Sequence, residues 1–246
     1  IGDFTTNNTS LNTYRLFRRA NYKADLITKW DASRTEFGDG GTAIADMNLD
    51  GKLDVIVAGS VGGTGNSSAF GCVYIYNPLT GEPLHSNAMI DIPRRSGNDG
   101  PSRPFVGDLD GDGYPEIALT ANYTLRAYKL DIASGLIKEM WRTTTTDSSS
   151  STTLSMFDFT QDGKARMIYR DQTTLRIIRS TDLGSVDEFV FSSATNSGTL
   201  NEYPIVIDVD GDGHAEILAT ATSATPWSNW HTDGQLRMYR ASGTSK

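Results

Sequence analysis

The stretch 107–117 reads "GDLDGDGYPEI" and places four carboxylates within nine residues, with glycines between them. These acids are Asp108, Asp110, Asp112 and Glu116. Carboxylates this close together repel one another unless a cation lies among them. Two interpretations follow: the stretch holds a metal ion, or it is a metal-free Asp-Gly turn before an apolar strand.

The same pattern occurs three more times, as "ADMNLDGKLDVIVA" (45–58), "FDFTQDGKARMIY" (157–169) and "IDVDGDGHAEILAT" (207–220). The first Asp of each copy is residue 46, 108, 158 or 208, so the copies begin 62, 50 and 50 residues apart. A chance Asp-Gly turn does not recur four times at such spacing. We therefore expect a repeated structural unit.

The flanks of these loops repeat as well. A short extended segment precedes each loop, an apolar run follows it, and a third, alternating segment comes next, such as "TLRAYKL", "TLRIIRS" or "QLRMYRA". Complete units add a less regular fourth segment, for example "IKEMWRT". Runs of β-branched and aromatic residues bounded by Gly, Ser, Asn and Asp indicate antiparallel strands. Four strands in about 50 residues are typical of a β-propeller blade. A β-sandwich is the alternative, but it would not need near-identical units.

The frame of the repeat predicts one all-β propeller segment over 1–246. Its parts are the last two strands of a blade (1–31), three blades (32–92, 93–142 and 143–192) and an incomplete blade (193–246). Both ends carry a third strand, so neither completes the other into a closed ring. Because open sheet edges invite pairing, we expect an arc of a larger ring, completed by the rest of a longer chain or by another molecule.

The spacing of the acids favours calcium. Alternating acidic positions on a tight turn direct their oxygens toward one point, and calcium takes six to eight oxygen ligands at about 2.3–2.6 Å. The loop 108–116 offers four carboxylates and the Tyr114 carbonyl, and Gly113 permits the sharp turn. An EF-hand would place its last acid at position twelve before a helix. Here the acid is at position nine, so the loop closes within a β-hairpin.

These loops resemble those of FG-GAP and VCBS repeats, the calcium-loop propeller blades of integrin α-chain heads and many bacterial surface proteins. The Phe-Gly and Gly-Ala-Pro signatures are largely missing and only "FVGD" (105–108) is reminiscent of them, which favours the bacterial VCBS-type group. The resemblance implies that loop positions 1, 3, 5, 7 (by its carbonyl) and 9 hold one structural Ca²⁺ in each of three loops. The implied ligands are Asp46, Asn48, Asp50, Lys52 and Asp54; Asp108, Asp110, Asp112, Tyr114 and Glu116; and Asp208, Asp210, Asp212, His214 and Glu216.

The loop 158–166 departs from the pattern. Asp158 and Asp162 keep the first and fifth positions, but Thr160 and Arg166 stand at the third and ninth. A guanidinium is permanently charged and can donate to two carboxylate oxygens at once. We therefore expect a weak or lost metal site, in which Arg166 bonds Asp158 or Asp162 and replaces the cation. The alternative is that Arg166 points to solvent and a weak calcium site survives.

Composition narrows the function classes. The net charge is −8, and the four loops hold 13 of the 30 acidic residues, so the acidity is attributed to metal sites and argues against a nucleic-acid partner. No apolar run approaches the roughly 18 residues of a membrane span, so no membrane insertion is expected. The chain has three histidines and neither an H-E-x-x-H nor a G-x-S-x-G motif. Enzymatic activity is therefore the less favoured interpretation.

The sequence thus favours a calcium-stabilised, non-enzymatic module of a secreted or cell-surface protein, extracellular and of bacterial type, that mediates adhesion. A protein or carbohydrate ligand would bind the face opposite the calcium loops, where an insertion carries Trp227, Trp230 and His231 and an earlier loop carries Arg94 and Arg95. The alternatives are that both tryptophans pack onto a neighbouring or missing blade and that the two arginines belong to a solvated loop. Aromatic faces offer sugars and peptides a large contact area at low entropic cost. The alternatives are a calcium-dependent polysaccharide-active enzyme, similar to some polysaccharide lyases, and a lectin module.

Overall fold

The computed structural model describes residues 10–18, 24–33, 38–61, 70–86, 101–147, 152–172, 174–192, 203–221 and 235–240. Within these ranges the regular secondary structure is entirely β-strand, and every pairing between neighbouring strands is antiparallel. The described residues include no helix long and apolar enough to cross a membrane.

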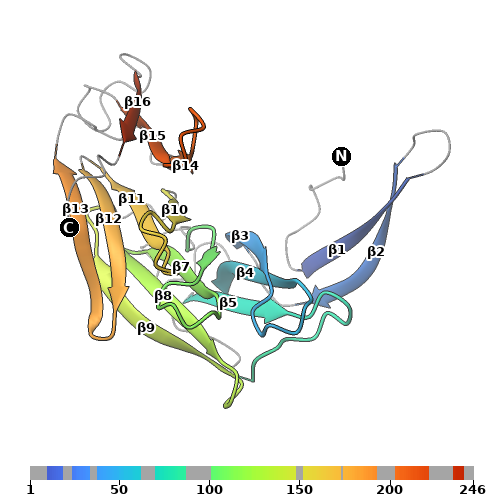
Figure 1. Ribbon diagram of the computed structural model, residues 1–246. Helices are drawn as coiled ribbons and strands as arrows, with labels where there is room; N and C mark the ends of the chain where they lie inside the picture. Colours follow the sequence, from blue (N-terminus) through green and yellow to red (C-terminus); the bar gives the residue numbers. More distant parts are fainter. Residues whose placement is uncertain are drawn as a thin grey trace.

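The strands form five sheets that follow one another along an arc (Figure 1). Their bounds are β1 (Ser10–Arg18) and β2 (Ala24–Ser33); β3 (Gly38–Ala45), β4 (Asp54–Val61) and β5 (Phe70–Tyr76); β6 (Phe105–Gly107), β7 (Glu116–Ala121), β8 (Thr124–Asp131) and β9 (Leu136–Thr144); β10 (Leu154–Phe157), β11 (Arg166–Asp171), β12 (Thr174–Thr181) and β13 (Gly184–Ser192); and β14 (Ile205–Ile207), β15 (Glu216–Ala221) and β16 (Gln235–Arg240). Within each sheet the strands lie in sequence order. The prediction of an all-β arc of propeller-type blades is confirmed.

One expected strand does not appear among the described residues. The sequence predicts a complete blade over 32–92, whereas the structure pairs β3, β4 and β5 and follows them with a single bridge between Tyr76 and Pro83. Residues 87–100 lie outside the described ranges. The β6–β9 and β10–β13 sheets each have four strands.

The second strand β7 is buried on both faces because its sheet lies between two other sheets. In β7 all six residues are buried. Ile117 and Leu119 belong to a cluster with Ile56 and Val73 of the preceding sheet, whereas Ala118 belongs to a cluster with Tyr169 of the following one. This position explains why the sequence after each loop is a continuous apolar run without alternation.

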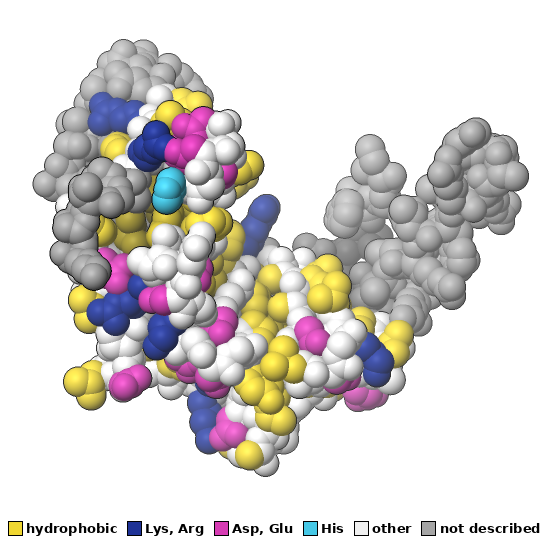
Figure 2. All heavy atoms as spheres, viewed as in Figure 1, with side chains coloured by type: hydrophobic (Ala, Val, Ile, Leu, Met, Phe, Trp, Pro, Cys, Tyr) yellow, Lys and Arg dark blue, Asp and Glu magenta, His cyan; other side chains and the backbone are white. Residues whose placement is uncertain are grey.

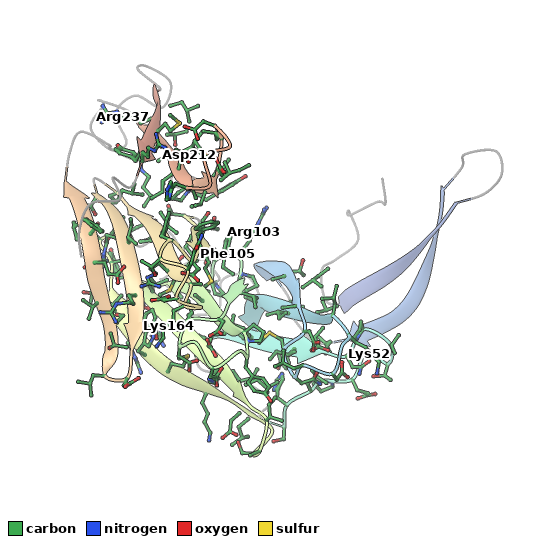
Figure 3. The ribbon with its side chains drawn as sticks, in the orientation of Figure 1. Lys52, Arg103, Phe105, Lys164, Asp212 and Arg237 are labelled. Carbon is green, nitrogen blue, oxygen red and sulfur yellow. The ribbon has the colours of Figure 1, made fainter. Side chains whose placement is uncertain are left out.

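Each acidic loop joins the first and second strands of a sheet, as the resemblance to FG-GAP and VCBS repeats implies. The short first strands contact one another in succession, from β3 to β6, β10 and β14. The four loops that leave these strands are therefore presented at equivalent places along the arc. Figure 3 shows Lys52, Lys164 and Asp212, each from the loop of a different sheet.

The β14–β16 sheet has one apolar face exposed. By register, Leu236 opposes Thr220 as Leu125 opposes Thr120, so the two leucines hold equivalent positions. Leu125 is 0% exposed and packs between sheets, whereas Leu236 is 69% exposed. Further large apolar side chains of this sheet are at least half exposed: Ile205, Ile207 and Met238.

Candidate metal centres

The four loops share one backbone conformation. In each, the fourth and sixth residues have positive φ, the left-handed region that favours glycine. The angles are 57° and 82° for Leu49 and Gly51, 81° and 89° for Gly111 and Gly113, 54° and 81° for Gln161 and Gly163, and 75° and 87° for Gly211 and Gly213. Because two loops adopt it with a non-glycine residue at the fourth position, the turn is imposed by its surroundings and not by glycine alone.

The first Asp of each loop holds this turn together. Its carboxylate accepts backbone N–H groups from the far side of the turn, and one oxygen always accepts the N–H of the sixth residue. Those N···O distances are 2.8 Å for Gly51 to Asp46, 2.8 Å for Gly113 to Asp108, 2.8 Å for Gly163 to Asp158 and 2.9 Å for Gly213 to Asp208. The fifth carboxylate accepts the N–H of the seventh residue at 2.9–3.0 Å, from Lys52, Tyr114, Lys164 and His214.

The ninth residue brings a buried carboxylate beneath the loop. Asp54, Glu116 and Glu216 are at most 1% exposed, and each accepts the backbone N–H of the second loop residue, at 3.0, 2.7 and 3.1 Å respectively. The other oxygen of Glu116 and of Glu216, Oε1, accepts no backbone hydrogen bond. Its charged neighbours are Lys129 Nζ, 3.2 Å from Glu116 Oε1, and Arg240 Nε, 3.7 Å from Glu216 Oε1. A buried carboxylate oxygen needs such a positive charge nearby, because leaving it unpaired is costly. Burial raises the pKa of Glu116 to about 7, because the charged form loses its hydration.

Two loops gather their acids closely enough for one cation. Asp108, Asp110 and Glu116 each offer a carboxylate oxygen within 4.8 Å of the others, and the corresponding three acids of the fourth loop, 208–216, do the same. Among the described residues these are the only such groups of acidic, His or Cys ligands. The ninth glutamate therefore adds a buried carboxylate to two partly buried or exposed ones in each of these two loops.

The first loop, 46–54, does not form such a group although its residues are described. Two differences explain this. Asn48 stands where the second and fourth loops have an acid, and Asp54 is one methylene shorter than the glutamates at the ninth position of those two loops. The acidic oxygens of this loop are consequently fewer and farther apart.

In the third loop the predicted contact of Arg166 is present. Its Nη1 and Nη2 donate to the two carboxylate oxygens of Asp162 at 2.6 and 2.9 Å, and Nη1 lies 3.8 Å from Asp158 Oδ1. Hydrogen bonding by this guanidinium lowers the pKa of Asp162 well below its usual range. Nε also lies 3.4 Å from Glu188 on β13. An internal cation thus stands at the ninth position of this loop.

Two further basic side chains reach the loops, and the motif analysis did not identify them. Lys129 Nζ lies 2.7 Å from Asp110 Oδ2, 2.5 Å from Asp112 Oδ2 and 3.2 Å from Glu116 Oε1. Burial alone would lower the pKa of Lys129, but its hydrogen bonds to Asp110 and Asp112 outweigh burial and raise it.

Arg240 occupies the equivalent place in the fourth loop. It opposes Glu216 in the register of β15 and β16, contacts Asp212, and lies 3.8 Å from Asp210 and 3.7 Å from Glu216 Oε1. A signal was present in the sequence: "LRAYK", "LRIIR" and "LRMYR" each end in a basic residue, namely Lys129, Arg179 and Arg240.

Comparison with known proteins identifies the repeat. Residues 46–119 match the FG-GAP-like repeat family. This range contains the first and second loops, so for this part of the chain the resemblance inferred from the sequence is confirmed. No curated protein matches the chain in sequence.

Two solved structures are similar to most of this chain. The crystal structure of the exotype rhamnogalacturonan lyase YesX matches 92% of this chain with a TM-score of 0.57 and 17% identity, and the chain covers 41% of it. The V. cholerae biofilm matrix protein Bap1 matches 84% of the chain with a TM-score of 0.43 and 17% identity, and the chain covers 38% of it. The chain therefore spans about two fifths of the length of these proteins. At such identity, the likeness to YesX shows the fold alone.

The residues predicted for a ligand face lie outside the described residues. These are Trp227, Trp230, His231, Arg94 and Arg95. Their role stays a prediction.

Proposed function

We propose that this chain is a propeller-type module that binds structural Ca²⁺ in its acidic loops. The observation that carries the proposal is the buried ninth glutamate, which gathers with two further carboxylates of its loop within 4.8 Å and whose Oε1 accepts no backbone hydrogen bond. Removing a carboxylate from water is costly unless a cation compensates for it. A metal ion bound to that oxygen would supply the compensation in the second and fourth loops.

The donor chemistry favours calcium over other metals. Every proposed ligand is an oxygen from a carboxylate, an amide or a backbone carbonyl, and the set contains neither imidazole nor thiolate. Oxygen-rich, adaptable sites suit calcium, whereas zinc and copper prefer nitrogen and sulfur ligands. A loop in which protein atoms provide most ligands suits a structural ion better than a catalytic one, which keeps open positions.

Calcium titration of the 246-residue chain tests this proposal. We expect three ions per chain by isothermal titration calorimetry, in the loops 46–54, 108–116 and 208–216, and none in 158–166. Glu116→Gln should remove one ion, because it keeps the acceptor for the Leu109 N–H but loses the charge. Asp131→Asn is the matched control, since Asp131 pairs with Lys138 on the same sheet and outside the loops. A chain that takes up no calcium at millimolar concentration would contradict the proposal.

We further propose that the module is non-enzymatic, belongs to a secreted or cell-surface protein, and mediates adhesion. Two features of the chain support this: the FG-GAP-like repeat and the assignment of much of its acidity to the loops. A general property of calcium sites agrees with it, because extracellular modules bind calcium with dissociation constants of about 10⁻⁴–10⁻³ M, which suit the calcium concentration outside cells. A protein or carbohydrate ligand would bind the Trp227 and Trp230 segment. Binding of fluorescent glycans or peptides that is lost in a Trp227→Ala, Trp230→Ala variant would support this assignment.

The exposed face of the β14–β16 sheet is proposed to take a further sheet of the same kind, from the rest of a longer chain. Its exposed Leu236 and Met238 hold the positions that Leu125 and Ala127 hold in the β6–β9 sheet, where the next sheet buries them completely. The face therefore offers apolar side chains at the positions through which the β6–β9 sheet contacts the next sheet. Large exposed apolar patches of this kind mark interaction surfaces.

A lyase-like activity is the second candidate, and one observation favours it. A surface hollow adjoins the second loop and is lined by Asp112, Tyr114 and Lys129 among others. A metal with a lysine beside it in a hollow is an arrangement that could act on an acidic polysaccharide. Incubation with rhamnogalacturonan and calcium, followed by ultraviolet absorbance of an unsaturated product, would support this candidate. No product would favour the binding module.

A further inference from the structure

Three of the four loops contain the charged end of a basic side chain. Lys129 and Arg240 reach the second and fourth loops from the third strand of their sheets, and Arg166 reaches the third loop from its own ninth position. The two third-strand residues come from equivalent positions, across from the ninth loop residue. The third-strand cation therefore recurs in the second and fourth loops, whereas the equivalent Arg179 of the third sheet bonds Glu188.

The first loop differs at that position. The residue there is Asn77, which directly follows β5 and whose Oδ1 accepts the backbone N–H groups of Leu79 and Thr80 at 2.9 and 3.3 Å. This amide closes its own turn and brings no positive charge. Lys52, within the loop, lies 3.7 Å from Asp50 with more than half of its side chain exposed.

The ammonium of Lys129 lies where the proposed calcium ligands converge. Its three partners, Asp110 Oδ2, Asp112 Oδ2 and Glu116 Oε1, lie 2.5–3.2 Å away. Calcium would take the same oxygens at about 2.3–2.6 Å. Two cations cannot share these atoms at such distances because their mutual repulsion is strong in a partly buried site. Calcium and the ammonium therefore exclude each other.

We propose that Lys129 in the second loop, and Arg240 in the fourth, are internal competitors that set the calcium affinity of their loops. The inference rests on the proposed calcium binding. Without calcium the basic side chain neutralises the carboxylates and keeps the loop folded. Calcium binds when its concentration is high enough to displace that side chain.

The charges of the loops support this assignment. The second and fourth loops each combine four carboxylates with one basic side chain from the third strand, which lowers their charge from −4 to −3. The first loop, with three acids and Lys52, has −2, and the third, with two acids, Lys164 and Arg166, is neutral. Since calcium affinity rises with the charge of the ligand set, removing Lys129 should strengthen the second site.

Solvent and a surface hollow beside the loop can accept the displaced Lys129 side chain. The side chain of Lys129 is 25% exposed, and its stem lines the hollow beside the loop, together with Asp131 and Met140. Rotation about its flexible stem moves the ammonium into solvent without a change of the backbone. Arg240, at 51% exposure, is freer still.

Calcium titration of Lys129→Met tests the competition. Methionine keeps the apolar stem and removes the charge, so we expect the affinity of one site to rise about tenfold as repulsion is lost. The melting temperature in excess chelator should fall, because the loop carboxylates lose their counter-charge. Lys138→Met is the matched control: it removes a lysine charge on the adjacent strand of the same sheet, where Lys138 pairs with Asp131 and not with the loop. It should change neither quantity.

The double variant Lys129→Met, Glu116→Gln tests whether the effect belongs to the second loop. Because Glu116→Gln removes that calcium site, the increase in calcium affinity seen in Lys129→Met should be absent from the double variant. If the wild type binds calcium and Lys129→Met binds it with unchanged affinity, the competition is overturned while calcium binding stands. If neither protein binds calcium, both proposals are overturned. An equal gain in Lys138→Met would show a general charge effect and would also overturn the competition.

Discussion

Removal of calcium is expected to lower the melting temperature of this chain by about 5–10 °C for each loop that loses its ion. A ligand that binds only the folded state stabilises it by about 2.7 kcal/mol at a free concentration one hundred times its dissociation constant. In a domain of this size 1 kcal/mol shifts the melting temperature by roughly 2–4 °C. Thermal unfolding in excess calcium and in excess chelator, followed by circular dichroism, measures the difference.

Asp110→Asn isolates one site in that experiment. The asparagine keeps an oxygen that can accept the N–H of Asp112, now 3.2 Å from Asp110 Oδ1, but it removes one charged ligand of the second loop. We expect the difference in melting temperature between excess calcium and excess chelator to be smaller in this variant, by the amount that one bound ion contributes. Asp131→Asn, outside the loops, should leave it unchanged. An identical melting curve in calcium and in chelator would show that the carboxylates serve another purpose.

The loops and strands could be predicted from sequence because both are local. A D-x-D-x-D-G pattern specifies a turn whose first carboxylate bonds backbone N–H groups three to five residues later, as Asp108 does to Gly111 and Gly113. The strands on either side follow from short apolar runs. Arg166 could be predicted for the same reason, since it lies four residues from Asp162.

The third-strand cations could not be derived from motif spacing. Lys129 lies 19 residues from Asp110 and 17 from Asp112, so their contact depends on the register of β7 and β8. The positive φ of Leu49 and Gln161 could not be predicted either, because neither residue type favours the left-handed region. Comparison of the third strands between repeats, not of the loops alone, would have revealed the recurring basic residue.

The contact between sheets gives the other large expected effect. Leu125→Ala should destabilise the chain by about 2–5 kcal/mol, the range for a buried leucine that leaves a cavity. Leu125 is fully buried in the cluster that joins the β6–β9 and β10–β13 sheets, with Trp141, Leu154 and Tyr169 among its members. Urea unfolding monitored by tryptophan fluorescence would measure the change in the free energy of unfolding.

Leu236→Ala is the matched control, because the same residue type stands at the equivalent position with 69% exposure. It should alter the free energy of unfolding by no more than about 0.5 kcal/mol, as surface substitutions usually do. Comparable losses in both variants would contradict the exposed face and indicate that another copy of the chain covers it in solution. In a longer chain that places a further sheet there, Leu236→Ala should become as damaging as Leu125→Ala, because only the neighbouring sheet distinguishes the two leucines.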